Sequence, residues 1–182
     1  QGIRTCGLKR DSFLGYTVYV DPSIAATALE SGPQDLLVDL RTFGFLFEIL
    51  CVRDLRVFAD ALGGEVYHYR DKNGLECDTV IHLRNGTYGL VEIKLGGEKL
   101  IEEGSANLRT LSAKIDTNKM KAPAFLMVLT GTGDYAYRRA DGMYVIPIGC
   151  LKDDFPCPFL RLFFVYSGAV SAPLVFCLDP NR

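Results

Sequence analysis

Apolar residues recur along the middle of the chain with two periods, which predict helices in some stretches and strands in others. Residues 33–62 are apolar around most of a helical circumference and end at Gly63-Gly64, so we expect one long helix buried on more than one face. Residues 101–115 are apolar on one helical face, which predicts an amphipathic helix. Short apolar runs predict strands at 65–70, on both sides of residues 84–86, at 124–129 and at 143–148. The order is helix, three strands, helix, strand, strand, and Pro147 suits an edge strand because proline cannot donate a ladder hydrogen bond.

Both ends of the chain differ from this middle part. Residues 1–35 hold a strand-like run at 16–20 and a short helix opening at Asp21-Pro22, and we expect an extension or linker without its own core. Residues 36–152 form the expected domain. Residues 153–182 are apolar but show no helical or strand period, and three prolines with Arg161 argue against a membrane helix. We interpret this tail as a loosely docked or non-native extension.

The composition is that of an ordinary soluble protein with one core. Its 182 residues, 48% hydrophobic and 23% charged, suffice for a single well-packed domain. The net charge of −2 excludes a chain-wide basic surface, so any contact with DNA needs local positive charge or another domain. The six cysteines show no CxxC spacing, which indicates reduced thiols and a cytoplasmic location. The chain begins with Gln rather than Met, and we expect it to be a piece of a longer protein.

The stretch 75–95 contains the strongest short-range pattern for a β-hairpin, an Asn-Gly pair between two apolar runs. A two-residue loop would pair Asp78 with Ile93 and would place the carboxylates of Asp78 and Glu92 on opposite faces. A three-residue loop with Gly86 in the left-handed region and a bulge pairs Asp78 with Glu92 instead. We predict this second register, which also makes two further pairs: Leu83 with Thr87, and Glu76 with Lys94.

Charged side chains within both strands of this hairpin carry the chemistry. Two opposed carboxylates, Asp78 and Glu92, have Cβ atoms about 4.5 to 5.5 Å apart and repel unless a cation lies between them. Oxygen ligands suit Mg²⁺ or Mn²⁺, so one interpretation is a metal site with Lys94 beside it. The other is a solvated hairpin face on which Lys94 forms an ion pair with Glu76. These residues alone do not decide between the two.

A third carboxylate is expected inside the long helix. Glu48 lies on the line of Gly44, Val52 and Leu55, and no Lys or Arg stands three or four positions from it. A buried carboxylate is costly unless it is paired or bound to a metal. The alternative is that Glu48 occupies a narrow exposed stripe of the helix.

Other chemical motifs are weaker. Residues 131–134, Gly-Thr-Gly-Asp, lack the Gly-Lys-Ser/Thr continuation and the helix of a phosphate-binding loop, so we expect a plain turn. His68 and His82 have no partner at zinc-ligand spacing. His82 shares the face of Asp78 by strict alternation, and we expect it to be a neutral strand histidine.

Asp followed by a turn and Glu-x-Lys on the next strand resembles the core motif of PD-(D/E)xK nucleases. Several segments together resemble one family, the uncharacterised domain that closes a group of prokaryotic AAA-type ATPases after a P-loop module and a winged-helix segment. These segments are Phe43-Gly44-Phe45-Leu46-Phe47-Glu48, Tyr67-His68-Tyr69-Arg70-Asp71, Leu75-Glu76-Cys77-Asp78, Val91-Glu92-Ile93-Lys94-Leu95-Gly96, Lys114-Ile115-Asp116 and Leu129-Thr130-Gly131. The resemblance covers roughly residues 14–152 and leaves the tail outside it.

The resemblance implies a restriction-endonuclease-like α/β core in which a central mixed sheet is flanked by helices in the order α-β-β-β-α-β. It implies that Glu48 is the helix acid, that Asp78 and Glu92 hold Mg²⁺ or Mn²⁺, and that Lys94 positions or activates water. It also implies an ATPase module preceding this chain as a partner. We therefore expect a magnesium-dependent DNA phosphodiesterase, an endonuclease. The alternative is a catalytically inactive module of the same fold that docks on a protein or binds DNA; the oligomeric state stays open.

Overall fold

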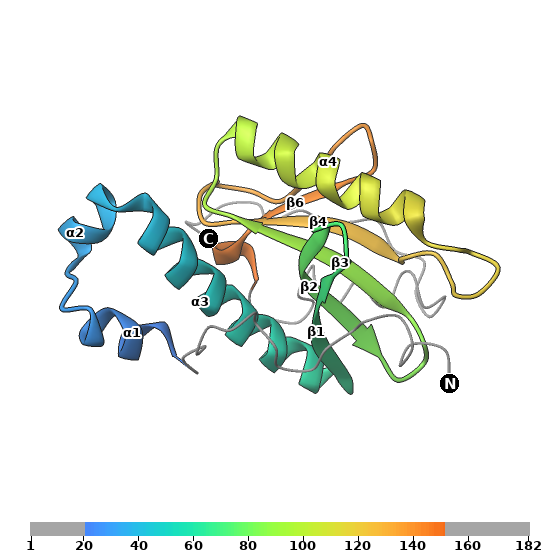
Figure 1. The fold of residues 1–182 in the computed structure, drawn as a ribbon, viewed down its shortest axis with the longest axis horizontal. Coiled ribbons are helices and arrows are strands. Elements are labelled where there is room, and N and C mark those ends of the chain that lie inside the picture. The colour runs from blue at the N-terminus through green and yellow to red at the C-terminus, as the bar shows by residue number, and fades with distance from the viewer. Residues whose placement is uncertain (1–20, 152–182) are drawn as a thin grey trace, which may run out of the picture.

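The computed structural model describes residues 21–151, in which a six-stranded mixed sheet lies between two longer helices (Figure 1). The helices are α1 (Pro22–Ala28), α2 (Pro33–Val38), α3 (Leu40–Ala61) and α4 (Glu98–Lys114), with a 3-10 turn η2 (Ile148–Cys150). The strands are β1 (Gly64–Arg70), β2 (Glu76–Leu83), β3 (Tyr88–Lys94), β4 (Phe125–Thr130), β5 (Tyr137–Arg138) and β6 (Tyr144–Pro147). This confirms the α/β class and the central mixed sheet. The predicted strand at 16–20 and the tail at 153–182 lie outside the described residues.

The sheet combines an antiparallel half with a parallel half. The strands are ordered β1-β2-β3-β4-β6-β5. β1, β2 and β3 form an antiparallel meander, whereas β3, β4 and β6 run parallel to one another. α4 connects β3 to the parallel strand β4, as such a crossover requires, because a parallel connection must carry the chain back across the sheet.

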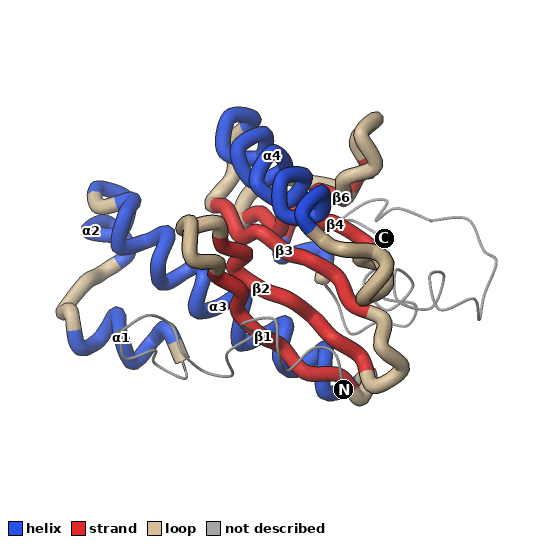
Figure 2. The backbone as a smooth tube through the Cα atoms, turned by 45° about the vertical axis from the view of Figure 1, so that its right-hand side comes forward, coloured by secondary structure: helices blue, strands red, loops and turns tan. Residues whose placement is uncertain are grey.

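The two longer helices cover opposite faces of the sheet, as Figure 2 shows for α3 and α4. Leu55 of α3 belongs to one buried apolar cluster with Val91 and Ile93 of β3. Leu108 of α4 belongs to the other cluster, with Leu90 of β3. Alternate residues of β3 therefore serve alternate helices, which follows from the two-residue period of a strand. Both faces of β3 are covered, so the strand is apolar almost throughout.

The predicted helix over 33–62 is two helices, because the chain breaks at Asp39. The backbone of Asp39 leaves the helical region, with φ −101° and ψ 78°, and Asp39 is the N-cap of α3. The Asp39 carboxylate accepts hydrogen bonds from the backbone N–H of Thr42 at 3.2 Å and from the Thr42 hydroxyl at 2.6 Å. Apolar residues continue on both sides of the break, so periodicity alone could not reveal it. The predicted short helix after Asp21 is confirmed, with the Asp21 side chain accepting from the Ser23 N–H.

The last predicted strand is not at the edge of the sheet. β6 lies between β4 and β5, and sequence analysis did not identify the two-residue strand β5. β5 pairs only with Tyr144 and Val145 of β6. Pro147 lies beyond these pairs, so its missing N–H removes no hydrogen bond to β5. The proline therefore marks the end of a ladder rather than the edge of the sheet.

The hairpin between β2 and β3 has the predicted register from Thr79 to His82, but its ladder ends at Thr79, so the predicted pairs of Asp78 with Glu92 and of Glu76 with Lys94 do not form. His82 pairs with Tyr88 and Thr79 with Val91. The Leu83 N–H donates to the Thr87 carbonyl at 2.8 Å, which closes a three-residue loop. Gly86 has φ 81°, the left-handed conformation that this loop requires.

Among the described residues, no helix is both long and apolar enough to cross a membrane.

Gly89 of β3 allows the ring of Phe125 on β4 to pack against the strand. A Cβ atom at position 89 would lie 2.1 Å from Cζ of this buried ring. We predict that Gly89→Ala lowers the free energy of unfolding by about 1–3 kcal/mol, because the ring must leave its packed position. Urea denaturation measures the change. Gly149→Ala is the control, since its added Cβ meets nothing within 4 Å; equal losses in both variants would contradict the prediction.

Candidate functional site

Three of the predicted residues meet where β2 begins and β3 ends. The Lys94 ammonium nitrogen lies 2.7 Å from Glu92 Oε2 and 3.5 Å from Asp78 Oδ2. The side chain of Glu92 is only 3% exposed, that of Asp78 11% and that of Lys94 25%. The structure thus brings the Asp and the Glu-x-Lys residues into one partly buried ionic cluster. We call Glu48, Asp78, Glu92 and Lys94 the acid–lysine cluster.

The expected ion pair between Lys94 and Glu76 is not the one that forms. Glu76 instead lies 3.4 Å from Arg70 on the neighbouring strand β1, at a largely exposed position. Lys94 is directed to the two buried carboxylates. The solvated hairpin face considered from the sequence is therefore wrong.

A β-bulge positions Asp78. Tyr67 of β1 pairs with Val80, but Tyr69 pairs with Cys77, so His68 faces two residues of β2, Asp78 and Thr79. Bulges bend a strand and redirect its side chains, and they are frequent next to functional sites. The paired region of β2 and β3 ends at Thr79, directly before Asp78.

The Asp78 carboxylate takes part in holding the strands together where their ladder ends. Its Oδ2 accepts a hydrogen bond of 2.7 Å from the backbone N–H of Ile93. Cys77 and Val80 lie in the same apolar cluster although they are three positions apart, so the bulge interrupts the alternation of faces. The prediction that Asp78 and His82 share a face does not hold, because it assumed strict alternation between them.

Glu48 approaches the cluster from α3, on the other side of the sheet from α4. It is half-buried on that helix. Burial, followed by the negative charge of Asp78, raises the pKa of Glu48 to about 7, while Lys94 acts in the opposite direction. Glu48 therefore interacts electrostatically with four charged residues of the hairpin: Asp78, Lys94, Glu76 and Glu92.

Glu92 and Lys94 respond to burial in different ways. Burial and the charge of Asp78 raise the pKa of Glu92 to about 7, against the stabilising effect of Lys94. Burial alone would favour a neutral lysine, but the charges of Asp78 and Glu92 outweigh it and raise the pKa of Lys94. Lys94 is therefore positively charged near neutral pH. Of the acids around it, Glu48 and Glu92 hold their protons more tightly than usual.

Asn107 of α4 belongs to this region, although sequence analysis did not identify it as a site residue. Its amide nitrogen donates to Glu92 Oε1 at 2.7 Å and to the backbone carbonyl of Glu76 at 2.7 Å. Gly104, one turn earlier, also faces the strand that carries Glu92 and Lys94. A Cβ there would lie 3.4 Å from Glu92 Cβ and 3.5 Å from Lys94 Cε. A polar residue on the inner side of an amphipathic helix was the one sequence feature that could have identified Asn107.

The donor set suits a hard divalent cation, since it consists of carboxylate oxygens. Within residues 21–151, however, no group of three or more acidic, histidine or cysteine side chains is arranged as a metal-binding cluster. Lys94 lies within 3.5 Å of both hairpin acids and supplies the positive charge between them. A metal held by Asp78, Glu92 and Glu48 would have to share this space with the lysine.

The weaker motifs have structural roles. Residues 131–134 form a turn, and the Gly131 N–H donates to the carbonyls of Lys94 and Leu95 at 3.2 and 3.1 Å, which supports the end of β3. Burial lowers the pKa of His82, in agreement with a neutral strand histidine. His68 Nδ1 lies 3.4 Å from the Asp78 carbonyl across the bulge. Cys51 and Cys77 are buried free thiols.

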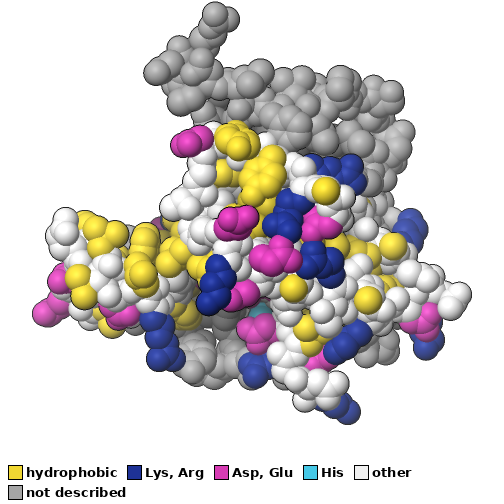
Figure 3. Space-filling model, turned by 90° about the horizontal axis from the view of Figure 1, so that it is seen from above, with side chains coloured by type: hydrophobic (Ala, Val, Ile, Leu, Met, Phe, Trp, Pro, Cys, Tyr) yellow, Lys and Arg dark blue, Asp and Glu magenta, His cyan; other side chains and the backbone are white. Residues whose placement is uncertain are grey.

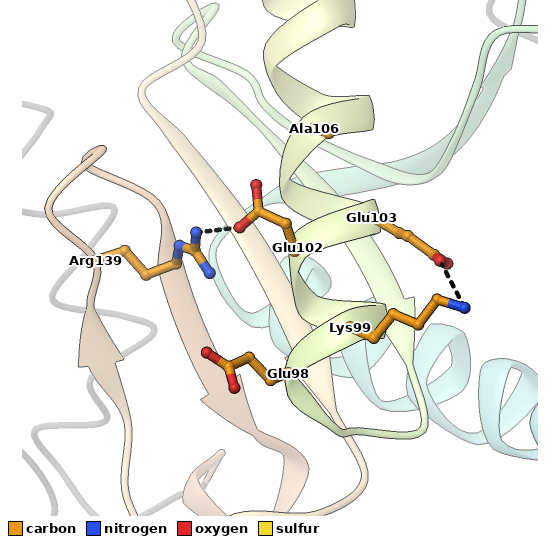
Figure 4. Close-up of a pocket in the computed structure, with 6 residues that line it drawn as sticks. All are labelled: Glu98, Lys99, Glu102, Glu103, Ala106 and Arg139. Atoms are coloured by element: carbon orange, nitrogen blue, oxygen red, sulfur yellow. Dashed lines mark hydrogen bonds and ion pairs between the residues drawn. The ribbon is translucent and has the colours of Figure 1, made fainter.

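A charged hollow on the outer side of α4 is separate from the acid–lysine cluster. Figure 4 shows its lining: Glu98, Lys99, Glu102, Glu103, Ala106 and Arg139. Arg139, from the segment between β5 and β6, forms an ion pair with Glu102, and Arg109 lies 2.8 Å from the same carboxylate. Both arginines also pair with Asp141. This network fastens the β5–β6 hairpin to α4 and contains no member of the acid–lysine cluster.

These features define a mixed α/β domain with a partly buried acid–lysine cluster where two strands separate. The sequence model of the family described as "Domain of unknown function (DUF4143)" matches residues 43–151, and the chain belongs to this family. The match includes all four residues of the cluster and excludes α1 and α2. No curated protein and no solved structure matched the chain.

The raised pKa of Glu48 predicts a pH dependence of stability. The unfolded chain releases this proton near pH 4.5, whereas the folded chain keeps it up to about pH 7. The folded state therefore binds more protons between these values, and the free energy of unfolding falls as the pH rises through them. Glu48→Gln should remove part of this fall. Urea denaturation at pH 4.5, 6 and 7.5 measures it; an identical pH profile in both proteins would contradict the prediction.

Proposed function

We propose that this domain is a metal-dependent phosphodiesterase that cleaves DNA, with a restriction-endonuclease-like core. The observation that carries the proposal is the convergence of Asp78 with Glu92 and Lys94 at the end of a hairpin, whose charges also act on Glu48 of α3. The element order α3-β1-β2-β3-α4-β4 matches the α-β-β-β-α-β order of that core and supports the proposal.

The four residues have distinct roles in this proposal. Asp78 and Glu92 would hold Mg²⁺ or Mn²⁺, and Glu48, on which the charges of Asp78 and Glu92 act, would be the third acid of the site. A bound divalent ion would polarise the phosphate and lower the pKa of a coordinated water. Lys94, kept protonated by its two acidic neighbours, orients the scissile phosphate by attracting its negative oxygen.

The raised pKa of Lys94 bears on which group removes the proton from the attacking water. In this proposal Lys94, whose pKa is raised by the charges of Asp78 and Glu92, stays protonated and orients the phosphate, and another group accepts the proton. Glu48, with a pKa near 7, is suited to accept it. Water oxygen then forms a bond to phosphorus, the bond to the 3′ oxygen breaks, and that oxygen takes a proton from solvent.

A longer chain also belongs to the proposal. The resemblance to domains that close AAA-type ATPases supports a preceding ATPase module as the partner of this domain. The gene sequence upstream of Gln1 tests it directly. A Walker A motif, G-x-x-x-x-G-K-[ST], in the same reading frame would support the association, and its absence would contradict it.

A second candidate function is a non-catalytic docking module, favoured by an apolar surface at the α1–α2–α3 corner. Val38 is 88% exposed, and Leu37 and Leu40 are both more than half exposed. Figure 3 shows hydrophobic side chains gathered over the part of the molecule that α1 and α2 form. Exposed apolar residues that lie together are typical of protein contacts. In this alternative the acid–lysine cluster is a structural network.

The nuclease proposal predicts DNA cleavage that depends on the cluster. The purified domain, incubated with supercoiled and linear DNA and Mg²⁺ or Mn²⁺, should convert supercoiled plasmid to nicked or linear forms on agarose gels. Asp78→Ala should abolish cleavage, and Glu48→Gln should slow it by about 10²–10⁴-fold, the usual contribution of a general base. Glu103→Gln, at an exposed carboxylate of α4, is the control and should cleave like the wild type. No cleavage by the wild type, or equal cleavage by Asp78→Ala, would refute nuclease activity.

Metal binding separates the nuclease from the docking module. Isothermal titration calorimetry of the wild type with Mn²⁺ should give a binding isotherm, and Glu92→Gln should abolish it because the buried ligand oxygen loses its charge. Glu103→Gln should bind as the wild type does. No heat at millimolar Mn²⁺ with the wild type would favour the docking module.

A further inference from the structure

Asn107 connects three parts of the domain through a single amide group. Its side chain reaches from α4 to the buried Glu92 of β3 and to the backbone of Glu76 at the start of β2. Both acceptors are oxygen atoms, so the nitrogen of the amide, with two hydrogens, is the group that satisfies them. Each hydrogen has one partner at 2.7 Å, and the donor capacity of the side chain is fully used.

These bonds divide the two oxygens of Glu92 between different partners. Oε1 accepts from Asn107, while Oε2 lies 2.7 Å from the Lys94 ammonium. Because both of its oxygens are held, the Glu92 carboxylate has one rotational position. It keeps this position although β3 is no longer paired with β2 at Glu92. The second bond, to the Glu76 carbonyl, fixes β2 two residues before Asp78. One side chain therefore sets the relative positions of the strands that carry both hairpin acids.

The geometry points to Asn107 as a positioning residue that orients Glu92 for binding the divalent cation, an inference that rests on the proposed metal site. Side chains that hydrogen-bond a ligand carboxylate fix its direction, and their loss commonly weakens metal binding by 10–100-fold. Asn107 contacts the second oxygen of the ligand rather than the cation or the DNA. It acts only through Glu92 and through the start of β2.

The experiment compares Mn²⁺ binding in the wild type and Asn107→Leu, a variant of similar shape without a donor. Calorimetry well below the melting temperature should show a dissociation constant for Mn²⁺ that is 10–100-fold larger in Asn107→Leu than in the wild type. Thr110→Ala on the same helix is the control, because its hydroxyl bonds only to the Ala106 carbonyl at an exposed position. It should bind Mn²⁺ as the wild type does. A side chain that only fastens α4 to the sheet would change the melting temperature and leave the affinity of the folded protein unaltered.

The possible results separate the two proposals. If the wild type binds Mn²⁺ and Asn107→Leu binds equally well, Asn107 does not position Glu92, and the metal site stands without it. If the wild type binds no Mn²⁺, the metal site and the role of Asn107 both fail. Should Asn107→Leu not fold, Asn107→Ala removes the same donors with a residue that favours helix, and the same loss of affinity is expected. An unchanged dissociation constant in that variant would overturn the inference.

Discussion

The contact between the Lys94 ammonium and the buried Glu92 carboxylate determines how this region of the domain is built. A carboxylate 3% exposed is costly to ionise unless a positive charge and hydrogen bonds accompany it. Lys94 provides the charge, and Asn107 provides the hydrogen bond to the other oxygen. Gly104 faces the same strand one turn before Asn107, where a Cβ would touch Glu92 and Lys94 at 3.4 and 3.5 Å. The ionic contact between Lys94 and Glu92 thus depends on how α4 packs against β3.

The end of the β2–β3 ladder has a similar physical cause. A continuous antiparallel ladder would leave Asp78 directly opposite Glu92, and like charges in that position repel. The β2–β3 ladder stops at Thr79, beside the bulge that Asp78 and Thr79 form against β1, and the carboxylate of Asp78 accepts a hydrogen bond from the N–H of Ile93. Strand pairing is replaced by a side-chain hydrogen bond of 2.7 Å, so the backbone donor stays satisfied.

Local patterns predicted those parts of the fold and site that local geometry governs. Asn85-Gly86 located the turn, and the three-residue loop, one of the two loop lengths considered, gives the register found from Thr79 to His82. The helix break at Asp39 was not predicted, because it is marked by a side chain that caps the start of α3 and not by a change in the apolar period. The bulge was not predicted because it is defined by the pairing of β2 with β1. Asn107 was not predicted because its partners are 15 and 31 residues away in the sequence. Contacts of that range depend on how a helix crosses a sheet, which no spacing within the sequence specifies.

The charge balance of the cluster connects its stability with its proposed chemistry. Three carboxylates face one ammonium, and burial and mutual repulsion raise the pKa of Glu48 and Glu92 to about 7. Near neutral pH the cluster therefore retains protons that exposed carboxylates would have released. A divalent cation, as proposed for this site, would stabilise the ionised forms, so its binding would expel these protons and its affinity would rise with pH until both acids are ionised. The same repulsion that costs folding stability above pH 4.5 thus becomes attraction for a cation, because binding relieves it.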